Sequence, residues 1–143
     1  MFKPLDGIRV IDLTQVLAGP YATYQLGLMG AEVIKIEKQE SGDWTREGGG
    51  VSELSDLNMG LGYLTQNANK KSITLDLKSD AGLNIVRQLA TSADVFVENF
   101  RPGTAEKLGL GFDEIKKLNN KIIYCSISAY GQDGPIGHRP AYD

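Results

Sequence analysis

Short apolar runs rich in β-branched residues alternate along the chain with segments in which apolar residues repeat at helical spacing. The runs predict strands over residues 9–13, 32–37, 72–77, 95–99 and 121–128, and the other segments predict helices over about 20–29, 80–93 and 112–118. The clearest helix is 80–93, which Ser79 precedes as a possible N-cap and whose apolar face comprises Ala81, Leu83, Val86, Leu89 and Ala90. Strand, helix and strand in repeat predict right-handed crossovers, so we expect an α/β fold: a Rossmann-like open, mostly parallel sheet flanked by helices.

The pattern breaks down between residues 39 and 67, where three consecutive glycines, Gly48 to Gly50, stand among scattered polar residues. This composition predicts a long loop or a mobile lid rather than a linker between domains. With 143 residues and 41% hydrophobic residues, the chain is long and apolar enough for one globular domain.

The charge balance argues against two classes of partner. Fifteen basic and 18 acidic side chains give a formal net charge of −3, so no overall field would draw the protein to nucleic acid or to an anionic membrane.

The only cysteine, Cys125, lies in the apolar run IIYCSI, which predicts a small buried hydrophobic side chain. A lone cysteine cannot form an internal disulfide, which favours a reducing, cytoplasmic setting.

Polar and glycine-containing segments follow the predicted strands, at the edge where open α/β sheets bind ligands. Residues 14–20 follow the first strand and begin a helix, whose free backbone amides would favour an anionic group. The small residues Ala18 and Gly19 are equally typical of any tight turn. Neither GxGxxG nor GxxxxGK[ST] occurs, so nicotinamide binding and P-loop hydrolysis lose their main support. His138 is the only histidine and receives no metal or catalytic role.

Other charged or polar residues could either bind a ligand or have no function beyond contact with solvent or a neighbouring loop. Lys35 and Lys38 flank Glu37 at the end of the second strand, where a lysine could lie over an adenine and reach phosphate, or simply be solvated. In the segment 69–78, we expect Ile73, Leu75 and Leu77 to form the buried face of a strand and Lys70 and Lys71 its solvated entry. Asn99 can hydrogen-bond a ligand or a neighbouring loop, while Arg101 and Lys107 offer positive charge for phosphate.

Five strings of the sequence share their order and spelling with one family. They are LDGIRVIDLTQVLAGP (5–20), VIKIE (33–37), SGDWTR (41–46), NKKSITLDLK (69–78) and VENFRPGTAEKLGL (97–110). Together they resemble the N-terminal part of the family III CoA-transferases, the group of formyl-CoA transferase, carnitine CoA-transferase and the 2-methylacyl-CoA racemases. The resemblance implies that residues 1–143 are the N-terminal CoA-binding α/β domain of a longer protein. The chain ends soon after the fifth strand, with no element to cover that edge, so we expect it to be a fragment.

The resemblance also implies which residues bind CoA, taken here as a substrate and not as a permanently bound cofactor. They are Gln15, Val16, Leu17, Ala18, Lys38, Leu75, Lys78, Asn99, Phe100, Lys107, Leu108 and Arg139. Lys38 stands where the family has an arginine that stacks on adenine, and Lys107 stands where arginine is common. Lysine keeps the charge but lacks the planar guanidinium face.

The mechanism that the resemblance implies is nucleophilic catalysis by an aspartate. Its carboxylate attacks an acyl-CoA to give an aspartyl anhydride, CoA thiolate then forms an aspartyl-CoA thioester, and the carboxylic acid acceptor finally takes the CoA. This aspartate is expected beyond Asp143, so we assign no catalytic residue in the chain and expect it to be inactive alone. A full-length parent would be an interlocked homodimer, with no nucleic acid, membrane or metal partner.

Three alternatives stay open, the first from the resemblance and the other two from the residues. A 2-methylacyl-CoA racemase of the same family has an acid/base histidine where this chain has Tyr142, and tyrosine, with a pKa of about 10, is a poor proton shuttle near neutral pH. A non-catalytic nucleotide-binding or flavodoxin-like module would have the same topology. In a purely structural domain, the loops would only close turns.

Overall fold

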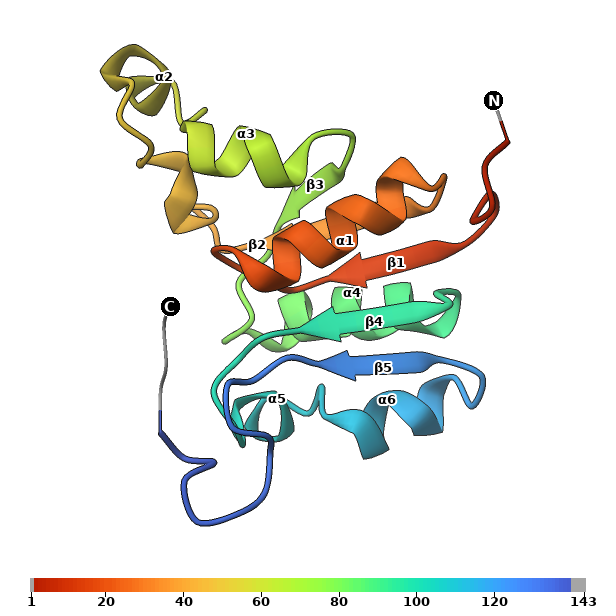
Figure 1. Ribbon diagram of the computed structural model, residues 1–143. Coiled ribbons are helices and arrows are strands. Elements are labelled where there is room, and N and C mark those ends of the chain that lie inside the picture. The colour runs from red at the N-terminus through yellow and green to blue at the C-terminus, as the bar shows by residue number, and fades with distance from the viewer. Residues whose placement is uncertain (1, 140–143) are drawn as a thin grey trace.

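Five parallel strands form one sheet in the order β3-β2-β1-β4-β5 (Figure 1). The structure is a computed structural model, and it describes residues 2–139. Its elements in chain order are β1 (Arg9–Asp12), α1 (Ala18–Leu28), β2 (Glu32–Glu37), a 3₁₀ turn η1 (Trp44–Arg46), α2 (Ser52–Asp56), α3 (Leu61–Asn67), β3 (Lys71–Thr74), α4 (Asp80–Thr91), β4 (Val95–Glu98), α5 (Thr104–Lys107), α6 (Phe112–Leu118) and β5 (Ile123–Ser126). The expected open, parallel α/β sheet is therefore confirmed.

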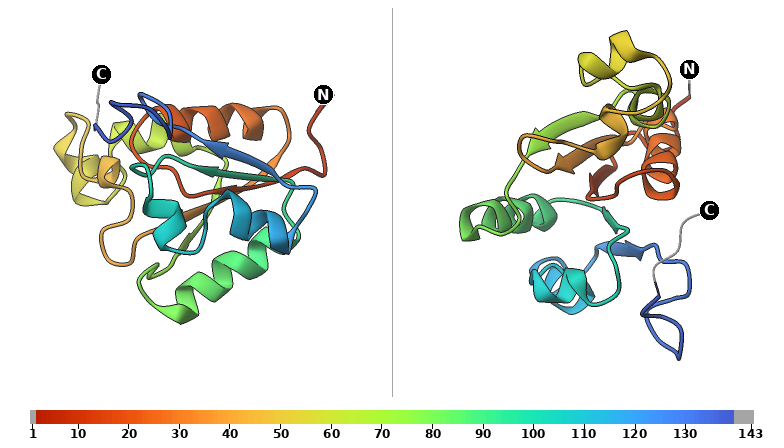
Figure 2. Two further views of the ribbon diagram at one scale, coloured as in Figure 1. Left: turned by 90° about the horizontal axis from the view of Figure 1, so that it is seen from below. Right: turned by 90° about the vertical axis from the view of Figure 1, so that its left-hand side faces the viewer.

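The helices cover the two faces of the sheet unequally. Helices α1 and α4 lie on opposite sides of it, and α6 lies on the side of α4 (Figure 2). We call these sides the α1 face and the α4 face. Because side chains alternate along each strand, β1 directs Ile11 to the α4 face and Asp12 to the α1 face.

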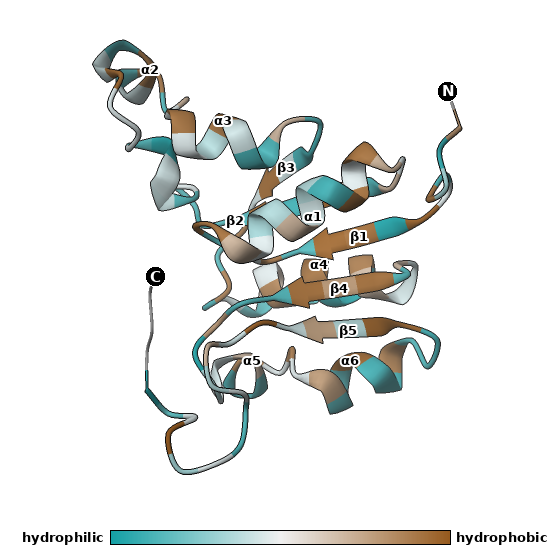
Figure 3. Ribbon diagram, viewed as in Figure 1, coloured by the Kyte–Doolittle hydropathy of each residue, from teal (hydrophilic) through white to brown (hydrophobic). Residues whose placement is uncertain are grey.

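The α4 face holds the larger hydrophobic core. Strand residues such as Ile11, Ile36 and Phe96 pack there against Val86 of α4 and Ile115 of α6, all at most 3% exposed. In Figure 3 the apolar colour accordingly dominates β1 and β4. The α1 face has a smaller apolar cluster of Val10, Ala31, Val33 and Val97. It also buries the charged residues Asp12, Lys35 and Glu37, each at most 3% exposed.

Local signals explain where two helices begin. The Ser79 hydroxyl accepts a hydrogen bond from the Gly82 amide, so the predicted N-cap of α4 is confirmed. Helix α1 packs closely on residues 13–17, the loop after β1 that we call the β1 loop, and a Cβ at Gly19 would overlap the Thr14 side chain. Glycine is required at that position by this close approach and not by an unusual φ angle.

The region from residue 39 to residue 67 differs from its prediction as a loop. It contains η1, α2 and α3, and α3 buries Tyr63 and Asn67. The prediction failed because α3 is short and its stability comes from packing on α1 and η1 rather than from a periodic apolar face.

Three burial predictions were also wrong. Lys70 is not solvated, because α3 and α1 enclose its side chain, which is 1% exposed. Ile73 is 37% exposed because β3 is an edge strand, although Leu75 is buried as expected. Cys125 is exposed on the other edge strand, β5, because α1 does not extend across it.

None of the helices within residues 2–139 is long and apolar enough to cross a membrane. Tyr142, which bears on the racemase alternative, and Asp143 both lie outside the described residues.

Candidate functional site

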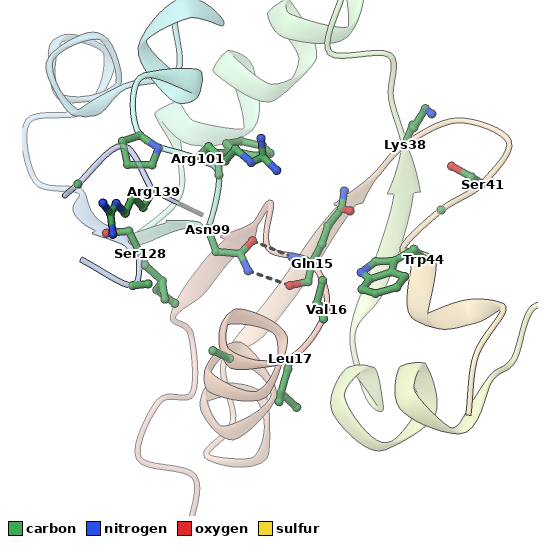
Figure 4. Close-up of a pocket in the computed structure, with 17 residues that line it drawn as sticks. Gln15, Val16, Leu17, Lys38, Ser41, Trp44, Asn99, Arg101, Ser128 and Arg139 are labelled. Carbon is green, nitrogen blue, oxygen red and sulfur yellow. Dashed lines mark hydrogen bonds between the residues drawn. The ribbon is translucent and has the colours of Figure 1, made fainter. Parts of the chain in front are cut away.

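A pocket of about 830 Å³ lies at the carboxyl edge of the sheet (Figure 4). The segments that follow β1, β2, β4 and β5 form its walls. The lining residues are Gln15, Val16, Leu17, Ala18, Lys38, Ser41, Gly42, Trp44, Asn99, Phe100, Arg101, Pro102, Ile127, Ser128, Ala129, Gly137 and Arg139. In the strand order 3-2-1-4-5, β1 and β4 are neighbours from which the chain departs in opposite directions, so the pocket lies at the topological switch point.

A side-chain clamp joins the two loops at this switch point. The Asn99 amide oxygen accepts a hydrogen bond from the Gln15 backbone N–H at 2.9 Å, and its amide nitrogen donates to the Gln15 carbonyl at 2.8 Å. The two dashed lines in Figure 4 mark this pair. Asn99 therefore fixes the backbone after β1 against the backbone after β4.

The next residue along the β1 loop has a strained backbone. Val16 has a φ of 77°, in the left-handed region that β-branched residues rarely adopt. Such conformations persist only where the surroundings impose them. The clamp at Gln15 is one such restraint. Gln66 of α3 is another, because with its amide nitrogen toward the loop it donates to the carbonyls of Val16 at 2.8 Å and Leu17 at 3.0 Å.

Two buried lysines bind backbone carbonyls of this loop and of the first turn of α1. Lys35 donates to the Thr14 carbonyl at 2.6 Å, and Lys70 donates to the Pro20 carbonyl at 2.9 Å. Lys70 also forms an ion pair with Asp12 at 2.9 Å. Burial lowers the pKa of Lys70, and the Asp12 carboxylate opposes that shift.

The loop's backbone amides have the opposite character. Within residues 2–139, the N–H groups of residues 16–19 have no hydrogen-bond acceptor in the protein, and no side chain caps the start of α1. Side chains of the protein thus bind the carbonyls of the loop. In contrast, the backbone amides at the start of α1 have no acceptor within residues 2–139 and are available to an oxygen of a ligand.

The wall that follows β2 rests on a second charged cluster. Glu37 forms two hydrogen bonds with the Arg46 guanidinium, both at 2.7 Å, and its carboxylate also accepts the Asp43 backbone N–H at 2.8 Å. Burial acts to raise the pKa of Glu37, but hydrogen bonds from Arg46, Ser72 and the Asp43 amide outweigh it and bring the pKa to about 2. Asp43 in turn lies 3.0 Å from Lys35 as a fully buried ion pair.

Three cations line the pocket, and all of them are exposed: Lys38, Arg101 and Arg139. Among the described residues none of the three forms an ion pair. In contrast, the buried lysines 35 and 70 are both paired. The pocket therefore presents positive charge that no carboxylate of residues 2–139 neutralises through an ion pair, which suits a polyanionic ligand. In the same residues no group of three or more His, Cys, Asp or Glu side chains is placed to hold a metal ion.

The structure brings together most, but not all, of the predicted site residues. Gln15, Val16, Leu17, Ala18, Lys38, Asn99, Phe100 and Arg139 line the pocket. The other four lie outside its lining. Leu75 is buried in the core of the α4 face, Leu108 is packed against that core, and Lys78 and Lys107 are exposed. These four stay predictions.

Several pocket residues carried no predicted role in the sequence. Trp44, Ser41 and Gly42 belong to the string SGDWTR, which contributed to the family resemblance but gave no chemical signal. Ile127, Ser128 and Ala129 follow β5, and their place after a strand could have suggested a role at the same sheet edge. Lys35, expected as a possible phosphate ligand or a solvated residue, is instead completely buried.

Comparison with known proteins gives a consistent family match. The model of "CoA-transferase family III" matches residues 5–143. Succinyl-CoA:glutarate CoA-transferase of Mus musculus is 50% identical over 141 residues, covering 99% of this chain and 32% of the relative. Acetyl-CoA:oxalate CoA-transferase of Acetobacter aceti is 44% identical over 140 residues, covering 98% of this chain and 35% of the relative. The chain thus spans about a third of these curated relatives.

A solved structure agrees with the sequence matches. The crystal structure of a CAIB/BAIF family protein from Brucella suis superposes with a TM-score of 0.90 at 38% identity, covering all of this chain and 38% of that one.

Proposed function

The chain belongs to CoA-transferase family III, and on that premise we propose that it is the CoA-binding part of an enzyme that moves CoA from an acyl-CoA to a free carboxylic acid. The observation that carries the proposal is the cluster of three exposed cations, Lys38, Arg101 and Arg139, around one pocket at the switch point, none of which forms an ion pair within residues 2–139. CoA combines a phosphorylated adenine nucleotide with an uncharged thiol-bearing arm, so it needs both cations and neutral surface.

The pocket offers both kinds of surface. Guanidinium groups of Arg101 and Arg139 suit phosphate oxygens, which they can hold by charge-assisted hydrogen bonds. The free amides at the start of α1 suit a further oxygen of the ligand. Leu17, Phe100 and Ile127 supply apolar lining for the arm.

The acids exchanged are proposed from the names of the relatives. Those relatives are named for succinyl-CoA with glutarate and for acetyl-CoA with oxalate, so we propose a short dicarboxylic acid as donor or acceptor. The aspartyl-anhydride route and the interlocked homodimer belong to the same proposal, with the nucleophilic aspartate outside residues 1–143. Leu75, Lys78, Lys107 and Leu108 remain proposed contacts for parts of CoA that extend beyond the pocket.

Calorimetric titration of CoA into the chain tests the proposal. We expect saturable binding that the double substitution Arg101→Ala and Arg139→Ala weakens by at least about tenfold, since each lost charge-assisted hydrogen bond is worth roughly 1.5–3 kcal/mol. The matched control is Lys117→Ala with Lys121→Ala, which removes the same charge from exposed positions outside the pocket. Equal weakening by both pairs, or no CoA binding at all, would overturn the proposal.

A further inference from the structure

Trp44 is the only tryptophan in the chain, and it lies at the pocket instead of in the core. It is 58% exposed. Figure 4 shows its indole across from Gln15 and Val16 of the β1 loop. A large aromatic surface that is open beside a pocket contributes little to the core and is available for contact with a ligand.

The backbone segment that carries Trp44 is held in place by buried charges. Asp43, the residue before it, caps η1 by accepting hydrogen bonds from the Thr45 amide at 3.0 Å and hydroxyl at 2.8 Å. The same carboxylate pairs with Lys35, whose ammonium also holds the Thr14 carbonyl below the β1 loop. One buried ammonium therefore fixes both the wall that carries Trp44 and the loop that carries Gln15.

The surroundings of Trp44 favour an uncharged part of the ligand. Its neighbours along the chain in the pocket lining are Ser41 and Gly42, which carry no charge. Arg101 and Arg139 lie on the opposite side of the pocket, and the Lys38 ammonium is directed away from the indole (Figure 4). The phosphates of the ligand would bind near Arg101 and Arg139, so the uncharged end of the ligand would lie near the indole.

We propose that Trp44 packs on the thioester arm of the acyl-CoA and so helps to determine which acyl groups the site accepts. The inference rests on the proposed function, because it assigns one end of a CoA ester to one wall of the same pocket. An indole gains from close contact with such an arm through its large apolar surface.

The fluorescence of this single tryptophan tests the inference without an activity assay. Acetyl-CoA and pantetheine should both change the Trp44 emission on binding. Adenosine 3′,5′-bisphosphate, which carries only the nucleotide end, should bind by calorimetry and leave the emission unchanged. Acetyl-CoA binding without an emission change, or an equal change with the nucleotide alone, would overturn the inference.

A substitution gives the second readout. Trp44→Ala should weaken acetyl-CoA binding by about tenfold while the affinity for adenosine 3′,5′-bisphosphate stays within about twofold. The control is Phe112→Ala, which removes an aromatic ring that is 51% exposed outside the pocket and should change neither affinity. Thermal unfolding of both variants verifies that they are folded. An unchanged acetyl-CoA affinity in folded Trp44→Ala overturns this inference alone, whereas the absence of heat with every ligand overturns the proposed function and the inference with it.

Discussion

The two faces of the sheet are stabilised by different means, although the same strands supply both. On the α4 face, Ile11, Phe96 and Ile115 are fully buried among other apolar side chains. On the α1 face, the buried pairs Lys35 with Asp43 and Lys70 with Asp12 lie directly below the β1 loop. Apolar packing stabilises the fold without fixing the direction of any single group. The buried lysines, in contrast, are held by their aspartate partners and bind specific backbone carbonyls. The face that supports the pocket is therefore the one that buries ion pairs between lysine and aspartate.

Each face buries a carboxylate whose pKa is shifted, Glu37 on the α1 face and Glu98 on the α4 face, and the two shifts have opposite directions. Glu37 on the α1 face is paired with Arg46, and its pKa is about 2. Burial raises the pKa of Glu98 on the α4 face, and hydrogen bonds from Ser126 and the Phe100 amide only partly oppose the shift. A partner cation decides whether a buried carboxylate supports the fold at neutral pH or weakens it.

The largest expected effect comes from breaking a buried pair on the α1 face. Lys70→Met leaves Asp12 charged and buried, so we expect a loss of about 3–5 kcal/mol in the free energy of unfolding. Its neighbour Lys71 is the matched control, because its side chain is 72% exposed and pairs with the surface residue Glu32. Lys71→Met should cost less than about 1 kcal/mol. Urea denaturation of the two variants measures the contrast, and equal losses would show that burial of the charge is unimportant.

A pH series on Glu37 should show the next largest effect. The folded protein binds fewer protons than the unfolded chain between the ordinary pKa of 4.5 and the folded pKa of about 2, so stability should fall as pH decreases through this window. The contribution is on the order of 3 kcal/mol at neutral pH. Glu37→Gln should remove that pH dependence, as followed by urea denaturation at each pH. A variant whose profile parallels the wild type would contradict the assignment.

On the α4 face, a methyl deletion should cost less and should be independent of pH. Ile115→Val creates a small void in the fully buried core and should cost about 1 kcal/mol. The pocket should not respond, so Trp44 emission and CoA affinity should equal those of the wild type. A change in either would show that the two faces are coupled.

The smallest expected effect comes from Glu98, whose contribution to stability should depend on pH in the direction opposite to that of Glu37. Because the raised pKa of Glu98 reflects an ionised form that burial disfavours, the stability that Glu98 confers should fall as pH rises above its ordinary value of 4.5. Glu98→Gln should stabilise the fold at pH 7 by at most about 1 kcal/mol and lose this advantage at low pH. Thermal unfolding at both pH values measures it. Destabilisation at pH 7 would contradict this expectation and show that the hydrogen bonds from Ser126 and the Phe100 amide outweigh the cost of burying the carboxylate.

The sequence predicted the features that depend on local pattern and missed those that depend on contacts between distant segments. Strand and helix positions follow from local periodicity, so β2 and α6 were predicted with the observed bounds, and the resemblance supplied Gln15 and Asn99 of the pocket. Burial of Lys35 and Lys70 depends on residues 39–67 folding over the α1 face, and no local pattern in that segment indicates such a contact. Exposure of Cys125 depends equally on which strand is at the edge of the sheet.

Trp44 shows which part of the candidate site could not be predicted from the sequence. Its string contributed to recognising the family, but only the structure shows that η1 places the indole beside the β1 loop. A hydrogen bond from Asn99 to a neighbouring loop was one of the predicted alternatives, but its partner Gln15 could not be identified from the sequence, since the two residues are 84 positions apart.

Hydrogen–deuterium exchange of the chain with and without CoA tests most directly whether this pocket is the CoA site. The backbone amides of residues 16–19 have no acceptor within the described protein, so they should exchange quickly when free and slow markedly when CoA is bound. Segments 99–102 and 127–129, which complete the pocket, should also be protected. Protection confined to other segments, with residues 16–19 unchanged at saturating CoA, would contradict the account.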